Sequence, residues 1–328
     1  MARIVVIGAS QGGILALHKL IGGLPETFSA PILIVQHIGP SQSMLPSILN
    51  DLGGTRAAFG TQGEMLREGR IYVAPPDHHM LLTDGHLKLT HGPRENWARP
   101  AIDPLFRTAA YHYGPDVIGI VLSGGLNDGT AGLYEIKRRG GIAIVQTPAE
   151  AETPDMPNSA LENVAVDYCL RVAEMPRLLL RLVQEPSEQT SLPVRGRTAM
   201  NQETFAEPTT QTCPECGGAM REENVGSLVR FRCPIGHVMT TDVLAITQLE
   251  RLKENLSAVL RGLNERAALC REIAQNQEAK GNHAAAEIWL EAADEAERRE
   301  RLTRALVDKG WVHPEAAAET LVGEARPA

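Results

Sequence analysis

The chain has 328 residues, of which 43% are apolar, 22% charged and 4% aromatic, a globular composition with room for two domains. It excludes collagen-like, low-complexity and wholly disordered chains. Forty acidic against 32 basic residues give a net charge of −8, so no global positive field attracts nucleic acid or anionic lipid. Because the apolar runs are far shorter than the ~18 residues of a membrane span, we expect no membrane insertion, and the charge balance predicts no nucleic-acid partner. Three of the five cysteines lie close to a histidine, which suits a metal site in a reducing compartment, so we expect a cytoplasmic protein.

The first half of the chain alternates short β-branched runs with helical stretches bounded by Gly and Pro. This pattern is typical of a parallel α/β sheet. The expected strands lie at residues 4–7, 31–36, 70–74, 117–122 and 142–146, and the expected helices at 12–22, 41–52, 102–113, 130–138 and 173–183. The alternating segment 81–89, centred on Asp84-Gly85, predicts a β-hairpin.

The second half has a different character. A polar, proline-containing stretch without periodicity predicts a flexible linker. Further on, apolar residues at spacings of three and four predict two helices, at about 242–278 and 283–309, separated by Lys280-Gly281-Asn282. The expected divisions are an α/β domain at 1–185, the linker at 186–208, a cysteine-rich segment at 209–240, a helical hairpin at 241–312 and a frayed tail at 313–328.

The strongest local pattern is Gly8-Ala9-Ser10-Gln11-Gly12-Gly13, between a predicted strand and a predicted helix. It lacks the Gly-x-Gly-x-x-Gly spacing of a dinucleotide loop, and no Tyr-x-x-x-Lys pair follows, so we expect no organic cofactor. It matches the Gly-x-Ser-x-Gly pattern of a nucleophile turn, in which small neighbours expose the serine hydroxyl and the next amides face an oxyanion. A serine that only caps the helix is the alternative.

A serine nucleophile needs a base and an acid at the same edge of the sheet. His37 follows the predicted strand 31–36, and Asp128 follows the predicted strand 117–122. Because the carboxyl ends of parallel strands meet at one edge, Ser10, His37 and Asp128 are candidate catalytic residues. The alternatives are a histidine bonded to backbone, an Asp-Gly turn, and glycine-rich loops that hold a phosphate.

Six segments in this half resemble the chemotaxis protein-glutamate methylesterases, in order and in spacing. They are residues 7–13, 35–38, 69–76, 99–106, 121–124 with Asn127-Asp128-Gly129, and 156–160. The resemblance implies an α/β fold with a doubly wound, mostly parallel sheet and helices on both faces. It also implies that Ser10 is the nucleophile, His37 the general base and Asp128 the acid. The implied reaction is hydrolysis of glutamate γ-methyl esters on receptor helices, which releases methanol, sometimes with deamidation of glutamine.

Two loops depart from the family pattern. Gly125-Leu126 stand where members have Met-Gly, and the loop 146–155 is acidic and rich in proline, which leaves the pocket rim and the substrate choice open. The family's receiver domain normally precedes the catalytic domain, and the first strand here starts at Ile4, so we expect no N-terminal receiver. The expected partner is a methylated receptor or another methyl-esterified protein. The alternative is a non-catalytic module that binds a receptor or ligand at the same glycine-rich rim.

Three cysteines and one histidine form a second cluster, in the segment 209–240. They are Cys213, Cys216, Cys233 and His237, in two short knuckles. Three thiolates and one imidazole at this spacing are typical of a tetrahedral zinc ribbon, and four protein ligands leave no open position, so one structural zinc is expected. The alternative is four ordinary side chains without metal. Because a long linker precedes it, we expect the ribbon to unfold without metal while the sheet keeps its fold and its activity on a small ester.

One further segment, residues 91–99, interrupts an acidic chain with Arg94, Trp97 and Arg99. We expect it to contact an acidic helix that bears the methyl esters. A structural salt bridge is the alternative.

Overall fold

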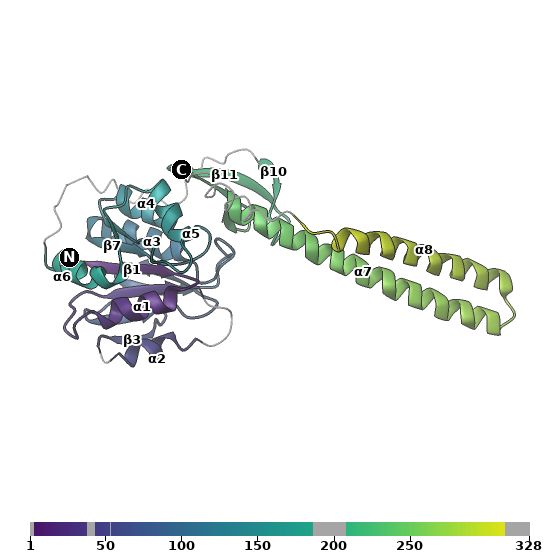
Figure 1. The fold of residues 1–328 in the computed structure, drawn as a ribbon, viewed down its shortest axis with the longest axis horizontal. Coiled ribbons are helices and arrows are strands. Elements are labelled where there is room, and N and C mark those ends of the chain that lie inside the picture. The colour runs from purple at the N-terminus through teal and green to yellow at the C-terminus, as the bar shows by residue number, and fades with distance from the viewer. Residues whose placement is uncertain (1–2, 38–42, 53, 186–207, 312–328) are drawn as a thin grey trace, which may run out of the picture. The chain divides into compact units, whose positions relative to one another are not determined.

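A computed structural model describes residues 3–37, 43–52, 54–185 and 208–311 (Figure 1). The chain divides into two compact units, residues 1–243 and residues 244–328. The predicted tail at 313–328 and the predicted linker, apart from residue 208, lie outside the described residues.

The first unit is built on a sheet of seven parallel strands in the order β3-β4-β2-β1-β7-β8-β9. The strands are β1 (Ile4–Ala9), β2 (Ile32–Gln36), β3 (Arg56–Phe59), β4 (Arg70–Val73), β7 (Val117–Val121), β8 (Ile142–Gln146) and β9 (Tyr168–Leu170). Strands β1, β2 and β7 are buried at every position. They are continuous apolar runs because helical layers cover both faces of the sheet.

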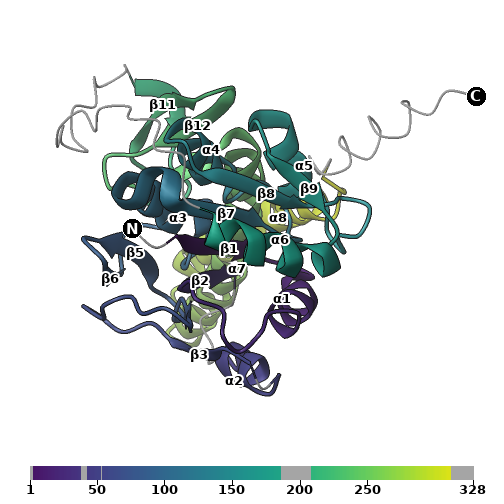
Figure 2. The ribbon, with the colours of Figure 1, turned by 90° about the vertical axis from the view of Figure 1, so that its left-hand side faces the viewer.

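Alternate residues of each strand enter two separate cores. Val5 and Ile7 pack with α1 (Gly13–Gly22), α2 (Leu45–Asn50) and α6 (Met175–Gln184) on one face. Ile4 and Val6 pack on the other face with a layer of helices and a hairpin (Figure 2). This second layer comprises α3 (Ile102–Tyr113), α4 (Thr130–Arg138), α5 (Asp155–Asn163), β5 (His79–Thr83) and β6 (His86–Thr90). The doubly wound fold expected from the family resemblance is confirmed.

The structure also has elements that the sequence pattern did not predict. The two edge strands, β3 and β9, are partly exposed and have only four and three residues, so their apolar stretches are too short to predict a strand. Helix α5 was not predicted, and it carries Pro157 and Asn158 near its start. The helix expected at 41–52 is shorter, since α2 covers only Leu45–Asn50, and residues 41–42 lie outside the described residues.

A second, antiparallel sheet belongs to the same compact unit. Its strands, in the order β10-β11-β12-β13, are β10 (Pro208–Thr212), β11 (Ala219–Val225), β12 (Leu228–Arg232) and β13 (Val238–Thr240). Exposed and partly buried residues alternate along β10 and β11. Figure 2 shows β11 and β12 beside α4, and a side chain at Gly226 would come within 2.5 Å of the Tyr134 ring. We call this sheet, with its two cysteine knuckles, the ribbon.

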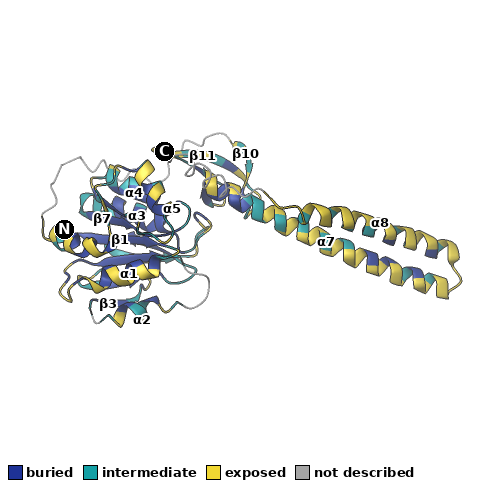
Figure 3. Ribbon diagram, viewed as in Figure 1, coloured by how far each residue is buried: buried dark blue, intermediate teal, exposed yellow. Residues whose placement is uncertain are grey.

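The second unit is a helical hairpin. Helix α7 (Thr241–Ala279), which begins at the end of the first unit, and helix α8 (His283–Val307) match the predicted helices within two residues at each end. Arg271 and Glu297 form an ion pair between the helices. Most side chains of the hairpin are exposed (Figure 3). Among the described residues, no helix is both long and apolar enough to cross a membrane.

Candidate functional site

The three candidate catalytic residues come from the carboxyl ends of three adjacent strands. Ser10 follows β1, His37 follows β2, and Asp128 lies in the loop between β7 and α4. Strand β1 pairs with β2 on one side and with β7 on the other. The chain winds outward in opposite directions from this point, and crevices in α/β sheets form where strand order reverses.

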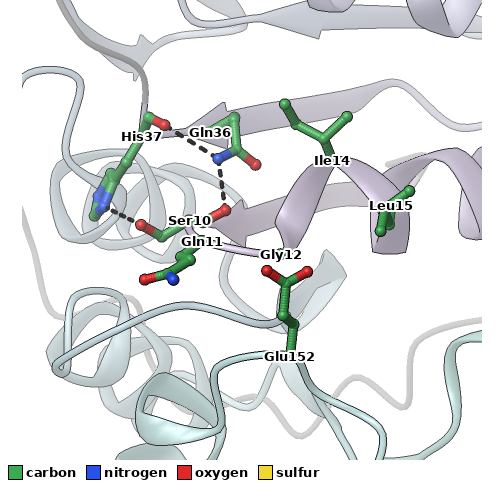
Figure 4. Close-up of a pocket in the computed structure, with 8 residues that line it drawn as sticks. All are labelled: Ser10, Gln11, Gly12, Ile14, Leu15, Gln36, His37 and Glu152. Carbon is green, nitrogen blue, oxygen red and sulfur yellow. Dashed lines mark hydrogen bonds between the residues drawn. The ribbon is translucent and has the colours of Figure 1, made fainter.

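His37 lies between the other two residues. Its Nδ1 atom is 3.1 Å from Ser10 Oγ (Figure 4), and its Nε2 atom is 2.7 Å from Asp128 Oδ2. An ionised carboxylate only accepts hydrogen bonds, so Nε2 carries the imidazole proton and donates it to Asp128. The Nδ1 lone pair is therefore free to accept the hydroxyl proton of Ser10. The structure thus brings together all three residues in the geometry of a nucleophile, a base and an orienting acid.

Asp128 is almost fully buried, with 2% of its surface exposed. Four donors besides His37 surround its carboxylate: the backbone N–H of Ile102 at 2.7 Å, of Gly129 at 2.9 Å and of Asp103 at 3.2 Å, and Asn96 Nδ2 at 3.0 Å. Burial raises the pKa of Asp128, but the bond to His37 and the surrounding donors outweigh it and hold the pKa below its usual value. The carboxylate is therefore ionised and fixed.

Asp103 is a second buried carboxyl group beside Asp128. Asn96 Nδ2 donates to Asp103 Oδ2 at 3.1 Å as well as to Asp128, so one amide bridges the two acids. Burial, together with the charge of Asp128, raises the pKa of Asp103 to about 7. The two carboxyl groups therefore differ in protonation near neutral pH, and Asp128 is the one that keeps its charge.

Hydrogen bonds hold the turn that carries the serine. The Ser10 N–H donates to the Ser123 carbonyl at 2.9 Å, and the Ser10 carbonyl accepts from Gln36 Nε2 at 2.8 Å. Ser123 Oγ donates to the Gln11 carbonyl at 2.7 Å. Gly12 has a φ of 75°, and a side chain there would lie 2.7 Å from Ser123 Oγ, so the turn requires glycine. Gln36 and Ser123 are site residues that the sequence analysis did not identify.

A cavity of about 500 Å³ opens beside the serine and the histidine. It is lined by Ser10, Gln11, Gly12, Ile14, Leu15, Gln36, His37 and Glu152 (Figure 4). Ile14 and Leu15 are 43% and 66% exposed and give the cavity an apolar rim, whereas Glu152 is an exposed acid at the same opening. A space of this size is large enough for a side chain of a protein substrate to reach Ser10.

The four candidate metal ligands converge at one end of the ribbon. Their ligand atoms all lie within 4.8 Å of one another. Cys216 Sγ is 3.5 Å from Cys233 Sγ, and His237 Nδ1 is 3.4 Å from Cys233 Sγ and 3.7 Å from Cys213 Sγ. Around zinc, with bonds of about 2.0 to 2.3 Å, tetrahedral ligand atoms stand roughly 3.5 to 3.8 Å apart. The donor set and its spacing fit a tetrahedral metal site.

The surroundings of the four ligands also fit a metal. His237 Nε2 lies 3.4 Å from Glu215 Oε2, and carboxylates in this position orient metal-binding imidazoles. Burial raises the pKa of the Cys213 thiol to about 12, so without a cation this group stays protonated at neutral pH. For Cys233, hydrogen bonds with His237 and Cys216 outweigh burial and lower the pKa to about 7.

The arginines of the segment 91–99 have different surroundings. Arg99 Nε donates to Asp77 Oδ1 at 2.8 Å, and Arg99 Nη1 donates to the Gly92 carbonyl at 2.9 Å. This matches the salt-bridge alternative for Arg99. Arg94 and Trp97 are exposed. The expected contact with an acidic helix therefore rests on these two residues.

Comparison with known proteins places this geometry in a family. The family model of the CheB methylesterase matches residues 5–179. The chain belongs to the CheB methylesterase family. A Leptospira interrogans protein provisionally named protein-glutamate methylesterase/protein-glutamine glutaminase is 42% identical over 187 residues, which are 56% of this chain and 97% of the relative.

Other CheB methylesterase relatives match the same part of the chain. A protein-glutamate methylesterase/protein-glutamine glutaminase of Anaeromyxobacter dehalogenans is 38% identical, over 56% of this chain and 54% of its own length. The crystal structure of the Thermotoga maritima CheB methylesterase catalytic domain aligns with a TM-score of 0.54 and 33% identity, over 56% of this chain and 99% of the solved chain. These matches span little more than half of the chain, so they provide no template for the ribbon and the hairpin.

Proposed function

We propose that this CheB methylesterase domain hydrolyses glutamate γ-methyl esters on a chemoreceptor-like protein. The observation that carries the proposal is His37, which bridges Ser10 Oγ at 3.1 Å and Asp128 Oδ2 at 2.7 Å. Ser10 is the nucleophile, His37 the general base and Asp128 the acid that orients it. The names of the relatives, and a cavity large enough for a side chain, support this choice of substrate.

The reaction proceeds through an acyl-serine. His37 Nδ1 takes the hydroxyl proton of Ser10 while Oγ attacks the ester carbonyl, and the same proton then leaves with methanol. Water then attacks the acyl group and gives a proton to His37, which returns it to Ser10 Oγ as the glutamate leaves. With a glutamine side chain the same steps release ammonia, which matches the glutaminase in the relatives' names.

The oxyanion of each tetrahedral intermediate needs hydrogen-bond donors. The Ser10 N–H is already bonded to Ser123, so the next amides, of Gln11 and Gly12, are the donors that we propose. A well-aimed donor of this kind stabilises the transition state by about 3 kcal/mol. Asp128 stabilises the imidazolium that forms when His37 takes the proton.

For the ribbon we propose one structural zinc, held by Cys213, Cys216, Cys233 and His237. Four protein ligands close the coordination sphere, so the metal stabilises the fold and takes no part in the ester hydrolysis. We also propose a cytoplasmic location, because thiolate ligands persist in a reducing compartment. The competing function, a non-catalytic binding module at the same rim, has no use for a base oriented between a serine and a buried acid.

The test compares Ser10→Ala with wild type on radiomethylated receptor membranes, with released methanol as the readout. We expect a loss of about 10⁴-fold or more in kcat, since serine, histidine and acid act as one unit. His37→Ala should lose nearly as much, and His18→Ala, an exposed histidine on α1, serves as the matched control. Undiminished methanol release by Ser10→Ala would rule out the proposed function.

A further inference from the structure

The ribbon contacts the α/β domain next to the candidate catalytic acid. Strand β13 runs along the loop that carries Asn96: the Asn96 N–H donates to the Val238 carbonyl at 2.8 Å, and the Val238 N–H donates to the Arg94 carbonyl at 3.3 Å. All these residues lie within the first compact unit. The sequence analysis expected the ribbon to be independent of the α/β domain, but these hydrogen bonds join the two.

Thr240, the last residue of β13, contacts two asparagines. Its backbone N–H donates to Asn96 Oδ1 at 3.4 Å, and its Oγ1 donates to Asn127 Oδ1 at 2.8 Å. Asn127 Nδ2 in turn donates to Asp242 Oδ2, in the first turn of α7, at 3.2 Å. Thr240 is 1% exposed, and the asparagines are 7% and 4% exposed. The two bonds of Thr240 therefore lie inside the protein, where each unmet polar group is costly.

Both asparagines are next to Asp128: Asn96 is hydrogen-bonded to it, and Asn127 precedes it in the chain. Asn96 can donate to Asp128 Oδ1 only while its amide is turned so that Oδ1 faces Thr240. Asn127 is the residue before Asp128 in the chain, and Leu126 before it has a φ of 63°, a conformation that is strained for a leucine. Such a loop needs support from its surroundings, and Thr240 and Asp242 provide it.

The same strand begins at the candidate metal site. His237 directly precedes β13, and its carbonyl accepts the Cys233 N–H at 3.0 Å. Only two residues lie between this ligand and Thr240. All three residues of β13 are buried, whereas few side chains of β10, β11 and β12 are, so apolar burial accounts for β13 but not for the rest of the ribbon. The candidate metal ligands join the two cysteine knuckles beside β13, and they are the feature that can hold the ribbon in one position around Thr240.

We propose that the ribbon positions the catalytic acid: metal binding at the four ligands fixes β13, and Thr240 then holds Asn96 and Asn127 so that Asp128 faces His37. Thr240 is a positioning residue, because it touches neither the substrate nor the reacting atoms. This inference rests on the proposed function, in which Asp128 orients His37. It couples metal binding to the rate of ester hydrolysis.

The first experiment isolates the Thr240 hydroxyl in the full-length, zinc-loaded protein. Thr240→Val keeps the shape and the backbone bond but removes the donor to Asn127. We expect kcat for p-nitrophenyl acetate to fall about tenfold with little change in KM, since small displacements of a catalytic group slow the reaction strongly. Thr240→Ser should restore the rate. The matched control is Thr210→Val, the same change at an exposed position of β10.

The second experiment tests the coupling to metal and has a readout besides activity. Chelation of the full-length protein should lower kcat by a similar factor, and added zinc should restore it. The Asn96 N–H, which is bonded to Val238, should lose protection against hydrogen exchange in the same step. In Thr240→Val, chelation should add little further loss of kcat, because the two changes break the same connection.

The outcomes separate this inference from the proposed function. If Ser10→Ala abolishes the ester hydrolysis while Thr240→Val and chelation leave kcat unchanged, the proposed function stands and the positioning role is wrong. If Ser10→Ala leaves the rate unchanged, the proposed function fails. Equal rates for Thr240→Val and Thr240→Ser also contradict the inference. This pair leaves all four ligands in place, so it tests the proposal even where the chelated protein unfolds.

Discussion

The two sheets of the first unit are stabilised in different ways. In the seven-stranded sheet the central strands β1, β2 and β7 are buried at every position, between two layers of helices. In the four-stranded ribbon only a few strand residues are buried, among them Met220, Val238 and Met239. Apolar burial stabilises the first sheet, whereas the second has little apolar burial and a cluster of cysteine and histidine side chains that fits a metal ion.

This difference bears on catalysis. The large sheet carries all three candidate catalytic residues at its strand ends, and its buried apolar strands are expected to fold without metal. The ribbon carries none of them, yet its residue Thr240 is bonded to both asparagines beside the acid. The ribbon, which is expected to need metal, thus contacts the candidate site on a sheet that is expected to fold without it. The following predictions test how separate the two sheets are.

The largest effect is expected from removal of the metal. Chelation, or Cys213→Ser, should unfold β10 to β13, because zinc supplies on the order of 10 kcal/mol of folding free energy to such small modules. Hydrogen exchange followed by mass spectrometry should show loss of protection in β11 and β12 and full protection in β1, β2 and β7. A ribbon that stays protected after chelation would mean that its contacts with the α/β domain suffice to fold it.

The next effect concerns the apolar core of the large sheet. Leu17→Ala, on the buried face of α1, should lower the free energy of unfolding by about 2 to 5 kcal/mol, in the presence or absence of zinc. Leu15→Ala on the same helix is the matched control, since Leu15 is 66% exposed, and its effect should stay within about 0.5 kcal/mol. Urea unfolding measures both. A zinc-dependent effect of Leu17→Ala would contradict the separation of the two sheets.

The sequence predicts the large sheet better than the contacts between the sheets. Buried parallel strands appear as continuous apolar runs, so β1, β2 and β7 are predictable, and strand ends locate Ser10 and His37. The edge strands β3 and β9 have only four and three residues, and their apolar stretches are too short to stand out.

No sequence pattern predicts the contacts between the ribbon and the candidate site. Ligand spacing predicts which four residues meet, because each knuckle is local in the chain. By contrast, Thr240 and Asn127 are 113 residues apart, and neither residue type nor spacing marks the hydrogen bond between them. A Thr or an Asn at these positions has many other uses. For the same reason the sequence analysis missed Asn96, which joins the acid to the ribbon.

A smaller, pH-dependent effect is expected from Asp103. Its pKa is raised to about 7 in the folded protein, against about 3.9 in the unfolded chain, so the folded state binds more protons between these values. Its contribution to stability is therefore greatest below pH 4 and is lost as the pH rises towards 7. The asparagine in Asp103→Asn cannot ionise, so this variant should not lose stability in this way as the pH rises.

The measurement for Asp103 is the free energy of unfolding at pH 5, 6, 7 and 8. Relative to wild type, Asp103→Asn should gain about 2 kcal/mol between pH 5 and pH 7 and little more above it. The control is Asp51→Asn, an exposed aspartate after α2, which should show no such trend. A difference between Asp103→Asn and wild type that is constant with pH would mean that Asp103 is ionised throughout.

The smallest effect is expected at the segment 91–99, where two arginines differ in their contacts. Arg94 is exposed, so Arg94→Ala should raise KM for methylated receptor membranes about twofold at low salt, and added salt should remove the difference. KM for p-nitrophenyl acetate should not change. Arg99 is bonded to Asp77, so Arg99→Ala should lower Tm slightly and change the kinetics of both substrates in parallel. If Arg94→Ala also affects both substrates equally, the segment is structural throughout, and the protein substrate binds elsewhere on the α/β domain.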